Sequence, residues 1–308
     1  MVQGIAALVT AAVIWGFAFV SQVQGMDSMS PLFFNAARFT LGAVSLLPVM
    51  TLSRKWTSDT IPAPTASNRP RAWASTAVVG TLCGALLFTA GTLQQYGILH
   101  GKSAGRAGFV TAIYIVLVPL FGLFLHRRVT ALTGLSVIIA LVGFYLLCFT
   151  NGPDGVNRGD LMVFLGSVCF ALHILAIDTL GARIDPIRLS FVQFVVTAAL
   201  SWIGALVDGS INWEGAAQAW IPLLYAGFGS VGIAYTLQSI GQRYVPPTQA
   251  ALALSLESLF SVVGGALLLG EQMTVRGYWG CVLIFSGTMM AQLPAKVPAF
   301  LRHGERTM

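Results

Sequence analysis

The sequence contains two copies of one pattern, and this internal repeat constrains the fold more than any other feature. The tripeptide Thr-Leu-Gln at 92–94 recurs at 236–238, an offset of 238 − 94 = 144 residues. Further upstream, Pro31 corresponds to Pro186, an offset of 186 − 31 = 155 residues. The chain therefore reads as one five-segment unit written twice, with a connection that is 155 − 144 = 11 residues shorter in the second copy. An internal repeat of this kind determines the architecture of the whole chain.

The composition is that of a polytopic membrane protein. Charged residues make up 9% of the chain and hydrophobic residues 56%, with a mean hydropathy of +0.78, whereas soluble domains contain roughly 25% charged residues. The net charge of +6 does not indicate nucleic-acid binding, because the basic residues lie singly or in pairs at the ends of apolar runs. The four cysteines lie far apart inside apolar runs. That spacing predicts neither a disulfide framework nor a metal site.

Ten stretches have the roughly 20 mostly apolar residues that a membrane-spanning helix needs. They cover approximately residues 4–23, 31–52, 73–97, 105–125, 131–149, 159–178, 187–207, 218–240, 247–270 and 276–293. We therefore expect an all-α polytopic membrane protein with ten transmembrane helices arranged as two inverted five-helix repeats. The first repeat is expected at 1–152, the second at 153–294 and a basic cytoplasmic tail at 295–308. The segment 53–71, rich in basic residues and prolines, is predicted to be a polar loop.

The distribution of lysine and arginine predicts the orientation of these helices. With the N-terminus in the cytoplasm, twelve basic residues fall on the cytoplasmic side and four on the external side. The twelve are Arg54, Lys55, Arg69, Arg71, Arg127, Arg128, Arg183, Arg188, Arg243, Lys296, Arg302 and Arg306, and the four are Lys102, Arg106, Arg158 and Arg276. Positive residues favour the inside, so both termini are expected in the cytoplasm of a bacterial cell, with the helices in its inner membrane. Five helices is an odd number, so the second repeat is expected upside down relative to the first, as in many secondary transporters.

Several motifs in this arrangement resemble a known family. They are Trp15-Gly16 in the first apolar run, Pro31 with Asn35 and Arg38 in the second, and the run 267–271, Leu-Leu-Leu-Gly-Glu, in the ninth. With two five-helix halves, they resemble the ten-helix EamA-type permeases of the drug/metabolite transporter superfamily over roughly residues 5–293. The resemblance implies a carrier that exports small metabolites, often amino acids or related compounds. One departure is that His126-Arg127 stands where the second repeat has Gly270-Glu271, so a carboxylate role in the first half is in doubt.

Three ionisable residues lie well inside apolar runs, where such groups are functional candidates by default. Glu257 shares a helix face with small residues; it is expected either to bind a proton or a cationic group, or to be a protonated carboxyl bonded to a neighbouring helix. Arg38 either holds a substrate carboxylate or serves as a structural arginine, and Asn35 lies on its face. His173 is either a proton relay or a hydrogen-bonded core histidine.

Uncharged polar residues form the larger set of candidates. Gln94 and Gln238 are repeat mates, and Tyr235 lies on the same helix face as Gln238. Gln22, Gln95, Tyr114 and Gln193 add further donors and acceptors, and the resemblance adds Trp15. Amides and phenols suit a cavity for a polar organic solute, although any single glutamine can equally be an interhelical packing contact.

The leading prediction is therefore a secondary transporter, an exporter of a small polar metabolite or amino-acid-like solute that works by alternating access, with a proton as the candidate coupling ion. The alternative is a passive facilitator or channel-like pore for small solutes. No P-loop, His-Glu-x-x-His motif or nucleophile elbow is present, so ATP-driven transport and enzyme chemistry are not expected. No cofactor, metal or nucleic acid is expected, and the expected partners are the solute and the lipid bilayer. The sequence leaves a monomer and a homodimer as alternatives.

Overall fold

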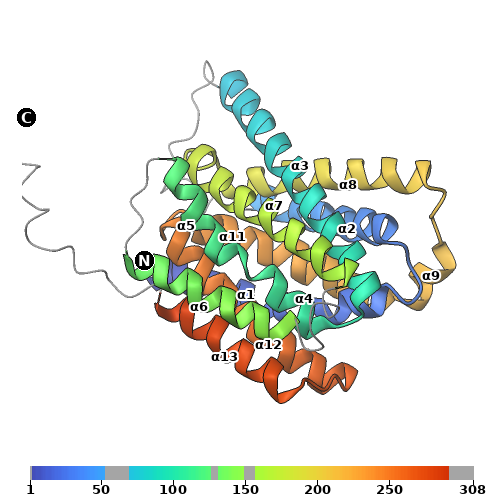
Figure 1. Ribbon diagram of the computed structural model, residues 1–308. Helices are drawn as coiled ribbons and strands as arrows, with labels where there is room; N and C mark the ends of the chain where they lie inside the picture. The colour runs from blue at the N-terminus through green and yellow to red at the C-terminus, as the bar shows by residue number, and fades with distance from the viewer. Residues whose placement is uncertain (1, 53–68, 126–130, 149–156, 291–308) are drawn as a thin grey trace, which may run out of the picture.

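In a computed structural model, residues 2–52, 69–125, 131–148 and 157–290 are described, and all of the regular structure in them is helical (Figure 1). Eight helical stretches are long and apolar enough to cross a membrane. They are α1 (Val2–Gly25), most of α2 (Pro31–Leu52), most of α3 (Arg69–Gly101), α4 with α5 (Ala104–Thr111 and Tyr114–Phe124), α7 (Arg158–Leu180), α8 (Pro186–Val207), α10 to α11 (Trp220–Gly241) and α12 (Pro247–Leu269). The polytopic, all-helical class predicted from the sequence is thus present in the described residues.

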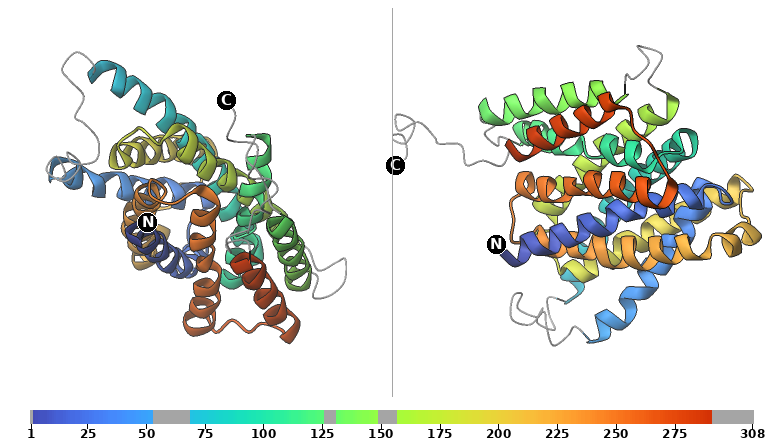
Figure 2. Two further views of the ribbon diagram at one scale, coloured as in Figure 1. Left: turned by 90° about the vertical axis from the view of Figure 1, so that its left-hand side faces the viewer. Right: turned by 90° about the horizontal axis from the view of Figure 1, so that it is seen from below.

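The fifth and tenth predicted spans correspond to shorter apolar helices. They form α6 (Ala131–Cys148) and α13 (Val275–Met290), which pack side by side at one edge of the bundle (Figures 1 and 2). Gly143 of α6 lies against the backbone of Gly280, and Gly287 of α13 lies against the backbone of Ser136. Small residues permit this close approach of two helices. The His126-Arg127 pair and the predicted tail at 295–308 lie outside the described residues.

The structure departs from the predicted helices in three places. First, α3 begins at Arg69, so the backbone at Arg69 and Arg71 is helical although the sequence places both residues in a loop. Second, the predicted helix 105–125 is divided at Ala112–Ile113, about two turns before Pro119. Third, the predicted helix 218–240 consists of α10 (Trp220–Leu224), the π-helix η3 (Tyr225–Tyr235) and α11 (Thr236–Gly241). The latter two irregularities both lie where polar residues turn toward the interior, and π-helical turns are frequent at functional sites.

Contacts between sequence-distant helices hold the bundle together. Helix α1 packs against α12, α3 packs against α7 and α8, and α2 packs against α8 and η3. The first half of the chain is therefore interleaved with the second. A short helix, α9 (Trp213–Gln218), covers one end of the bundle beside the α1–α2 turn, where Asn212 Nδ2 donates to the Ser28 carbonyl over 3.1 Å.

Candidate functional site

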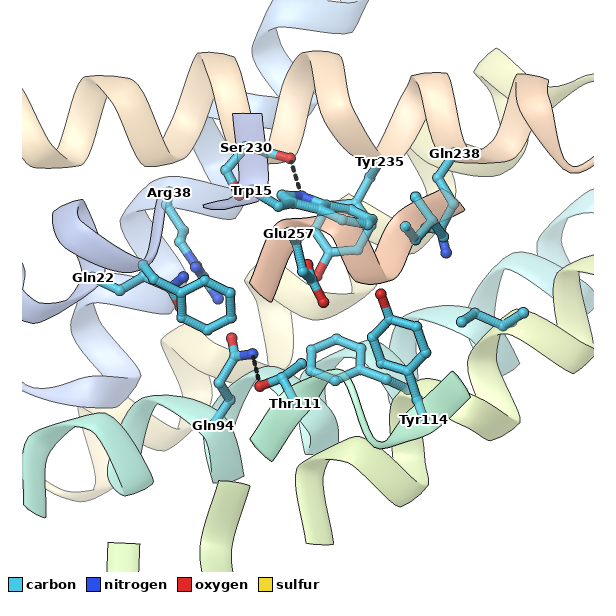
Figure 3. A pocket seen from close by; sticks show the side chains of 14 residues that line it. Trp15, Gln22, Arg38, Gln94, Thr111, Tyr114, Ser230, Tyr235, Gln238 and Glu257 are labelled. Carbon is cyan, nitrogen blue, oxygen red and sulfur yellow. Dashed lines mark hydrogen bonds between the residues drawn. The ribbon is translucent and has the colours of Figure 1, made fainter. Parts of the chain in front are cut away.

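The described residues enclose a buried pocket between the two halves of the chain (Figure 3). Helices from both halves contribute side chains to it. The lining residues are Trp15, Phe19, Gln22, Arg38, Gln94, Thr111, Tyr114, Phe170, Ile174, Ser230, Tyr235, Gln238, Leu254 and Glu257. The structure thus brings eight of the eleven candidate residues from the sequence into one place. A concave, mostly apolar site with a few convergent polar groups is the usual form of a small-molecule site.

Arg38 supplies the positive charge of the pocket. Its side chain extends from α2, is 2% exposed, and stacks its guanidinium over the rings of Phe34 and Phe39 at 5.6 Å and 5.0 Å. Its Nε has no hydrogen-bond partner, and no carboxylate oxygen of the described residues lies within 4.0 Å of the guanidinium. A buried cation without an anionic partner is costly. The arrangement therefore suits a guanidinium that meets an anionic group of a ligand.

Glu257 supplies the negative charge. It is 4% exposed, and its carboxyl points into the middle of the pocket between Arg38 on one side and the Tyr114 hydroxyl on the other (Figure 3). Tyr114 begins α5 directly after the break at Ala112–Ile113, and this break directs the ring into the pocket. The small residues that share the Glu257 face pack closely, because a Cβ on Gly264 would lie 3.0 Å from Val20 of α1. The face thus serves helix packing, while Glu257 itself reaches the pocket.

The two repeat-mate glutamines lie in the pocket in different settings. Gln94 Nε2 donates to Thr111 Oγ1 over 3.0 Å. Gln238 lies on α11, and its buried Oε1 has no partner. Gln22 Oε1, on α1, is also buried without a partner. Leaving buried acceptors unpaired costs about 1–3 kcal/mol each, which a polar ligand or water in the pocket would offset.

The π-helix η3 positions Tyr235 against the first helix. The indole Nε1 of Trp15 donates to the Ser230 carbonyl over 3.1 Å, and the Trp15 and Tyr235 ring centroids lie 4.6 Å apart, edge to face. Tyr235 lines the pocket together with Arg38 and Glu257. The edge-to-face contact with Trp15 fixes the ring of Tyr235 there.

The three remaining candidates lie beside the pocket and do not line it. His173 and Gln193 are fully buried and joined to each other, with His173 Nε2 and Gln193 Oε1 2.9 Å apart. The His173 ring also contacts Tyr235, with centroids 6.3 Å apart. Asn35, on α2, is 1% exposed, and its Oδ1 has no partner. His173, Gln193 and Asn35 therefore lie next to residues that line the pocket.

Two further amides considered with the candidates have other places. Gln95 Nε2 donates to the Gln22 carbonyl over 3.2 Å, a contact between α3 and α1. Gln242 follows Tyr235 at i+7 and Gln238 at i+4, a spacing that would place all three on one face of a uniform α-helix. It instead donates to the Ile174 carbonyl over 3.3 Å and lines a second pocket, with Asp178 and Arg243. The π-helical turns before α11 shift the angular register that uniform α-helical spacing assumes.

Sequence reasoning missed several lining residues. Thr111 and Ser230 are single hydroxyl residues among apolar ones, and Ser230 contributes a backbone carbonyl, which no side-chain pattern reveals. Phe19, Phe170, Ile174 and Leu254 are apolar and look like any core residue. Among the described residues, no group of three or more His, Cys, Asp or Glu residues is placed to bind a metal ion.

Known proteins resemble this chain in both sequence and fold. The model of the EamA-like transporter family matches residues 2–149 and 157–292. An uncharacterized transporter of Archaeoglobus fulgidus is 28% identical over 287 residues, which are 93% of this chain and 84% of that protein. The threonine/homoserine exporter RhtA of Escherichia coli is 25% identical over 193 residues, 58% of this chain and 64% of that protein. A solved crystal structure has the same fold, with a TM-score of 0.69 and 20% identity over 94% of this chain and 96% of that one.

Proposed function

We propose, from the premise that this chain belongs to the EamA-like transporter family, that it exports a small polar, amino-acid-like solute across the bacterial cytoplasmic membrane by alternating access. The family match confirms the prediction of a membrane transporter rather than an enzyme. The solute, the direction, the mechanism and the membrane are our inferences. The observation that carries them is the presence of Arg38 and Glu257 in one buried pocket without an ion pair between them.

The charges of the pocket fit a solute that carries both an anionic and a cationic group. Arg38 offers planar donors that match a carboxylate in a bidentate manner. Glu257 offers an acceptor for an ammonium group. Gln22, Gln94 and Gln238 offer donors and acceptors for a hydroxyl or amide of the solute. The amino acids in the printed name of RhtA carry these groups, which supports the same class of solute for this chain.

Alternating access between two inverted five-helix units is supported by close contacts that recur between repeat mates. Gly97 of α3 meets the Gly159 carbonyl of α7, where an added Cβ would lie 2.7 Å from that oxygen. The mates of this pair are Gly241 (97 + 144) and Gly4 (159 − 155), and a Cβ on Gly241 would lie 2.9 Å from the Gly4 carbonyl oxygen.

The contact between α6 and α13 also recurs between repeat mates. A Cβ on Gly143 would lie 2.6 Å from the Gly280 carbonyl oxygen, and one on Gly287 would lie 2.8 Å from the Ser136 carbonyl oxygen. The mates of Gly143 and Ser136 are 143 + 144 = 287 and 136 + 144 = 280. A two-fold axis in the membrane plane produces this exchange of partners. On this basis we count α6 and α13 as the fifth and tenth spans.

Glu257 is the proposed coupling group. It is the acid that lines the pocket, and Arg38, Tyr114 and Tyr235 are the charged or titratable groups that line it too. A proton bound there from one side and released to the other would drive export. A passive facilitator is the second candidate; it needs the same pocket but no coupling acid.

Transport by purified protein in proteoliposomes tests the proposal. L-Threonine is the first probe, followed by the other amino acids with a hydroxyl or amide side chain. A carrier is expected to show saturation and accelerated exchange when unlabelled probe is present on the opposite side. Flux that rises linearly with concentration, without exchange, would contradict alternating access and favour a channel-like pore.

A further inference from the structure

Five residues at the junction of α3 and α4 make polar contacts with three other parts of the chain at one end of the bundle. We call this segment, Lys102 to Arg106, the 102–106 hub. Its contacts are to the α1–α2 turn, to α7 and to the turn between α12 and α13. The last two belong to the second half of the chain. The positive-inside prediction places this end on the external side of the membrane.

The contact with the α12–α13 turn is made by a single carboxylate. Glu271 accepts hydrogen bonds from Ser103 Oγ (2.9 Å), from the Ala104 amide (2.6 Å) and from the Gly105 amide (3.1 Å). The Ala104 and Gly105 donors are free amides at the start of α4, where negative charge is favoured. Glu271 thus holds the first turn of α4, in the first half, from a turn in the second half.

Two glycines make room for this carboxylate. Gly270 has φ +66°, a left-handed conformation that reverses the chain after α12, and the Glu271 amide then donates to the Gly265 carbonyl over 3.0 Å. A Cβ on Gly265 would lie 2.7 Å from Glu271 Oε2. The Gly270-Glu271 pair therefore folds the Glu271 carboxylate back over the end of α12.

The contact with α7 is a two-point ion pair. Arg106 Nε and Nη2 lie 2.7 Å and 2.6 Å from Asp160 Oδ1 and Oδ2. Asp160 is only 5% exposed and also accepts from the Asn157 amide in the capping box of α7. Bidentate geometry of this kind is among the stronger polar contacts. The Lys102–Asp27 pair is 3.8 Å long, with both side chains about two-thirds exposed, and contributes little.

The backbone of the hub is itself strained. Lys102 has φ 47°, and it is the one non-glycine residue with positive φ in the described part of the chain. A lysine in the left-handed region costs of order 1–3 kcal/mol and persists only when its surroundings enforce it.

At the opposite end of the bundle, three of the charged residues in these contacts have uncharged repeat mates, and the mate of a fourth, Glu271, is Arg127 (271 − 144 = 127), which lies outside the described residues. The mates of Lys102, Arg106 and Asp160 are Pro246 (102 + 144), Ala250 (106 + 144) and Ile5 (160 − 155). Close apolar packing is found there instead, since a Cβ on Gly4 would lie 2.7 Å from Tyr244 Cβ and 2.9 Å from Val245 Cγ2. Among the described residues, these contacts are therefore polar at one end of the pathway and apolar at the other.

We infer that the 102–106 hub, with Glu271 and Asp160, is a latch that holds the external end of the transport pathway closed and sets the resting orientation of the carrier toward the cytoplasm. This inference rests on the proposed alternating access. Opening the external end requires the two halves to separate there, which breaks the contacts of Glu271 and Arg106. At the internal end, the described contact of Gly4 with Tyr244 and Val245 is apolar packing, so opening at this contact breaks no ion pair.

The test measures which side of the membrane reaches the pocket, and it needs no substrate. A single reporter cysteine is introduced as Ser230→Cys, which keeps the backbone carbonyl that Trp15 uses, in a chain whose four native cysteines are replaced. A membrane-impermeant maleimide is then applied to right-side-out and to inside-out vesicles. Loss of one charge-assisted hydrogen bond shifts an equilibrium by about tenfold or more, so Glu271→Ala is expected to speed external labelling by about that factor and to slow internal labelling.

Arg106→Gln is the second latch variant and leaves Glu271 in place. Glu214→Ala, which removes an exposed acid from α9 on the same side, is the matched control and is expected to leave both rates unchanged. Unchanged labelling in both latch variants would overturn the inference. Faster labelling from both sides would overturn it too, because loosening of the fold gives that result and a shift between two orientations does not. Failure of the proteoliposome transport assay would count against the proposed function and would leave the labelling result readable.

Discussion

Gly97 and Gly159 bring α3 and α7 into backbone contact, such that a Cβ on either residue would lie within 2.7 Å of the carbonyl oxygen of the other. These helices come from different halves of the chain, and the same contact recurs between Gly241 and Gly4. The exclusion of any side chain at these points sets the distance between the halves. The pocket between them exists because the halves meet closely at both ends.

The first test concerns this packing. Gly97→Ala is expected to destabilise the protein by about 1–3 kcal/mol, because an added methyl must displace backbone atoms of α7. Gly101→Ala, on the same helix, meets nothing within 4 Å, so it is expected to be neutral or stabilising by up to about 1 kcal/mol through helix propensity. Thermal unfolding in detergent measures both. Equal midpoints for the two variants would show that the helices adjust freely.

The second test concerns the amides of the pocket. Gln94→Ala removes the donor to Thr111, and Gln238→Ala removes an unpaired acceptor. Each is expected to lower transport about tenfold, because a lost polar contact with a solute costs about 1–1.5 kcal/mol. The exposed residue Gln218 gives the matched control Gln218→Ala. Wild-type transport from both pocket variants, at normal expression, would make these glutamines packing residues.

The sequence predicted the fold class and most of the pocket because membrane proteins show their polar interior plainly. Arg38, Glu257 and the repeat-mate glutamines are conspicuous among apolar residues. The π-helix η3 and the break before Tyr114 could not be predicted from the sequence. The residues at 225–235 and at 112–113 have a composition that also occurs in continuous membrane-spanning helices. The role of Glu271 was also missed. Two of its three hydrogen-bond donors are backbone amides about 166 residues away in the chain, and backbone groups leave no trace in a side-chain pattern.

The third test concerns the cation of the pocket. Arg38→Lys retains the charge but loses the planar pair of donors, and the shorter ammonium cannot stack on Phe34 and Phe39 in the same way. We expect half-saturation by a carboxylate-bearing probe to rise about tenfold or more in this variant, and transport to be lost in Arg38→Gln. Arg188→Lys, outside the pocket, is the control for the same exchange. Unchanged half-saturation in Arg38→Lys would assign the arginine to helix packing alone.

The fourth test concerns topology. Reporter fusions at Ser67 and after Arg302, positions outside the described residues, are expected to report the cytoplasm. A fusion at Gly209, directly after α8, is expected to report the external side. These three positions sample both predicted sides of the membrane independently. An external C-terminus would require an odd number of spans or the reverse insertion, and either result would end the inverted-repeat argument.

The last test concerns the proposed coupling acid. Glu257→Gln keeps the shape and hydrogen-bonding capacity of the side chain but removes its ability to titrate, while Arg38, Tyr114 and Tyr235 around the same pocket remain in place. A pH gradient then has no group at Glu257 on which to act, so gradient-driven transport is expected to be abolished. Exchange of labelled for unlabelled probe is expected to persist, because exchange moves no net proton and the glutamine oxygen still accepts a hydrogen bond from the ammonium group of the solute.

The two readouts separate the alternatives for Glu257. The matched control is Glu214→Gln, an exposed acid on α9, for which both gradient-driven transport and exchange are expected to match the wild type. Unchanged pH dependence in Glu257→Gln would rule out the carboxyl as the coupling group and favour a passive facilitator. Loss of the folded protein from the membrane would instead assign Glu257 to interhelical packing. Loss of exchange together with gradient-driven transport, in a folded protein, would show that the negative charge of Glu257 is needed to hold the ammonium of the solute, because that contact is made in both modes.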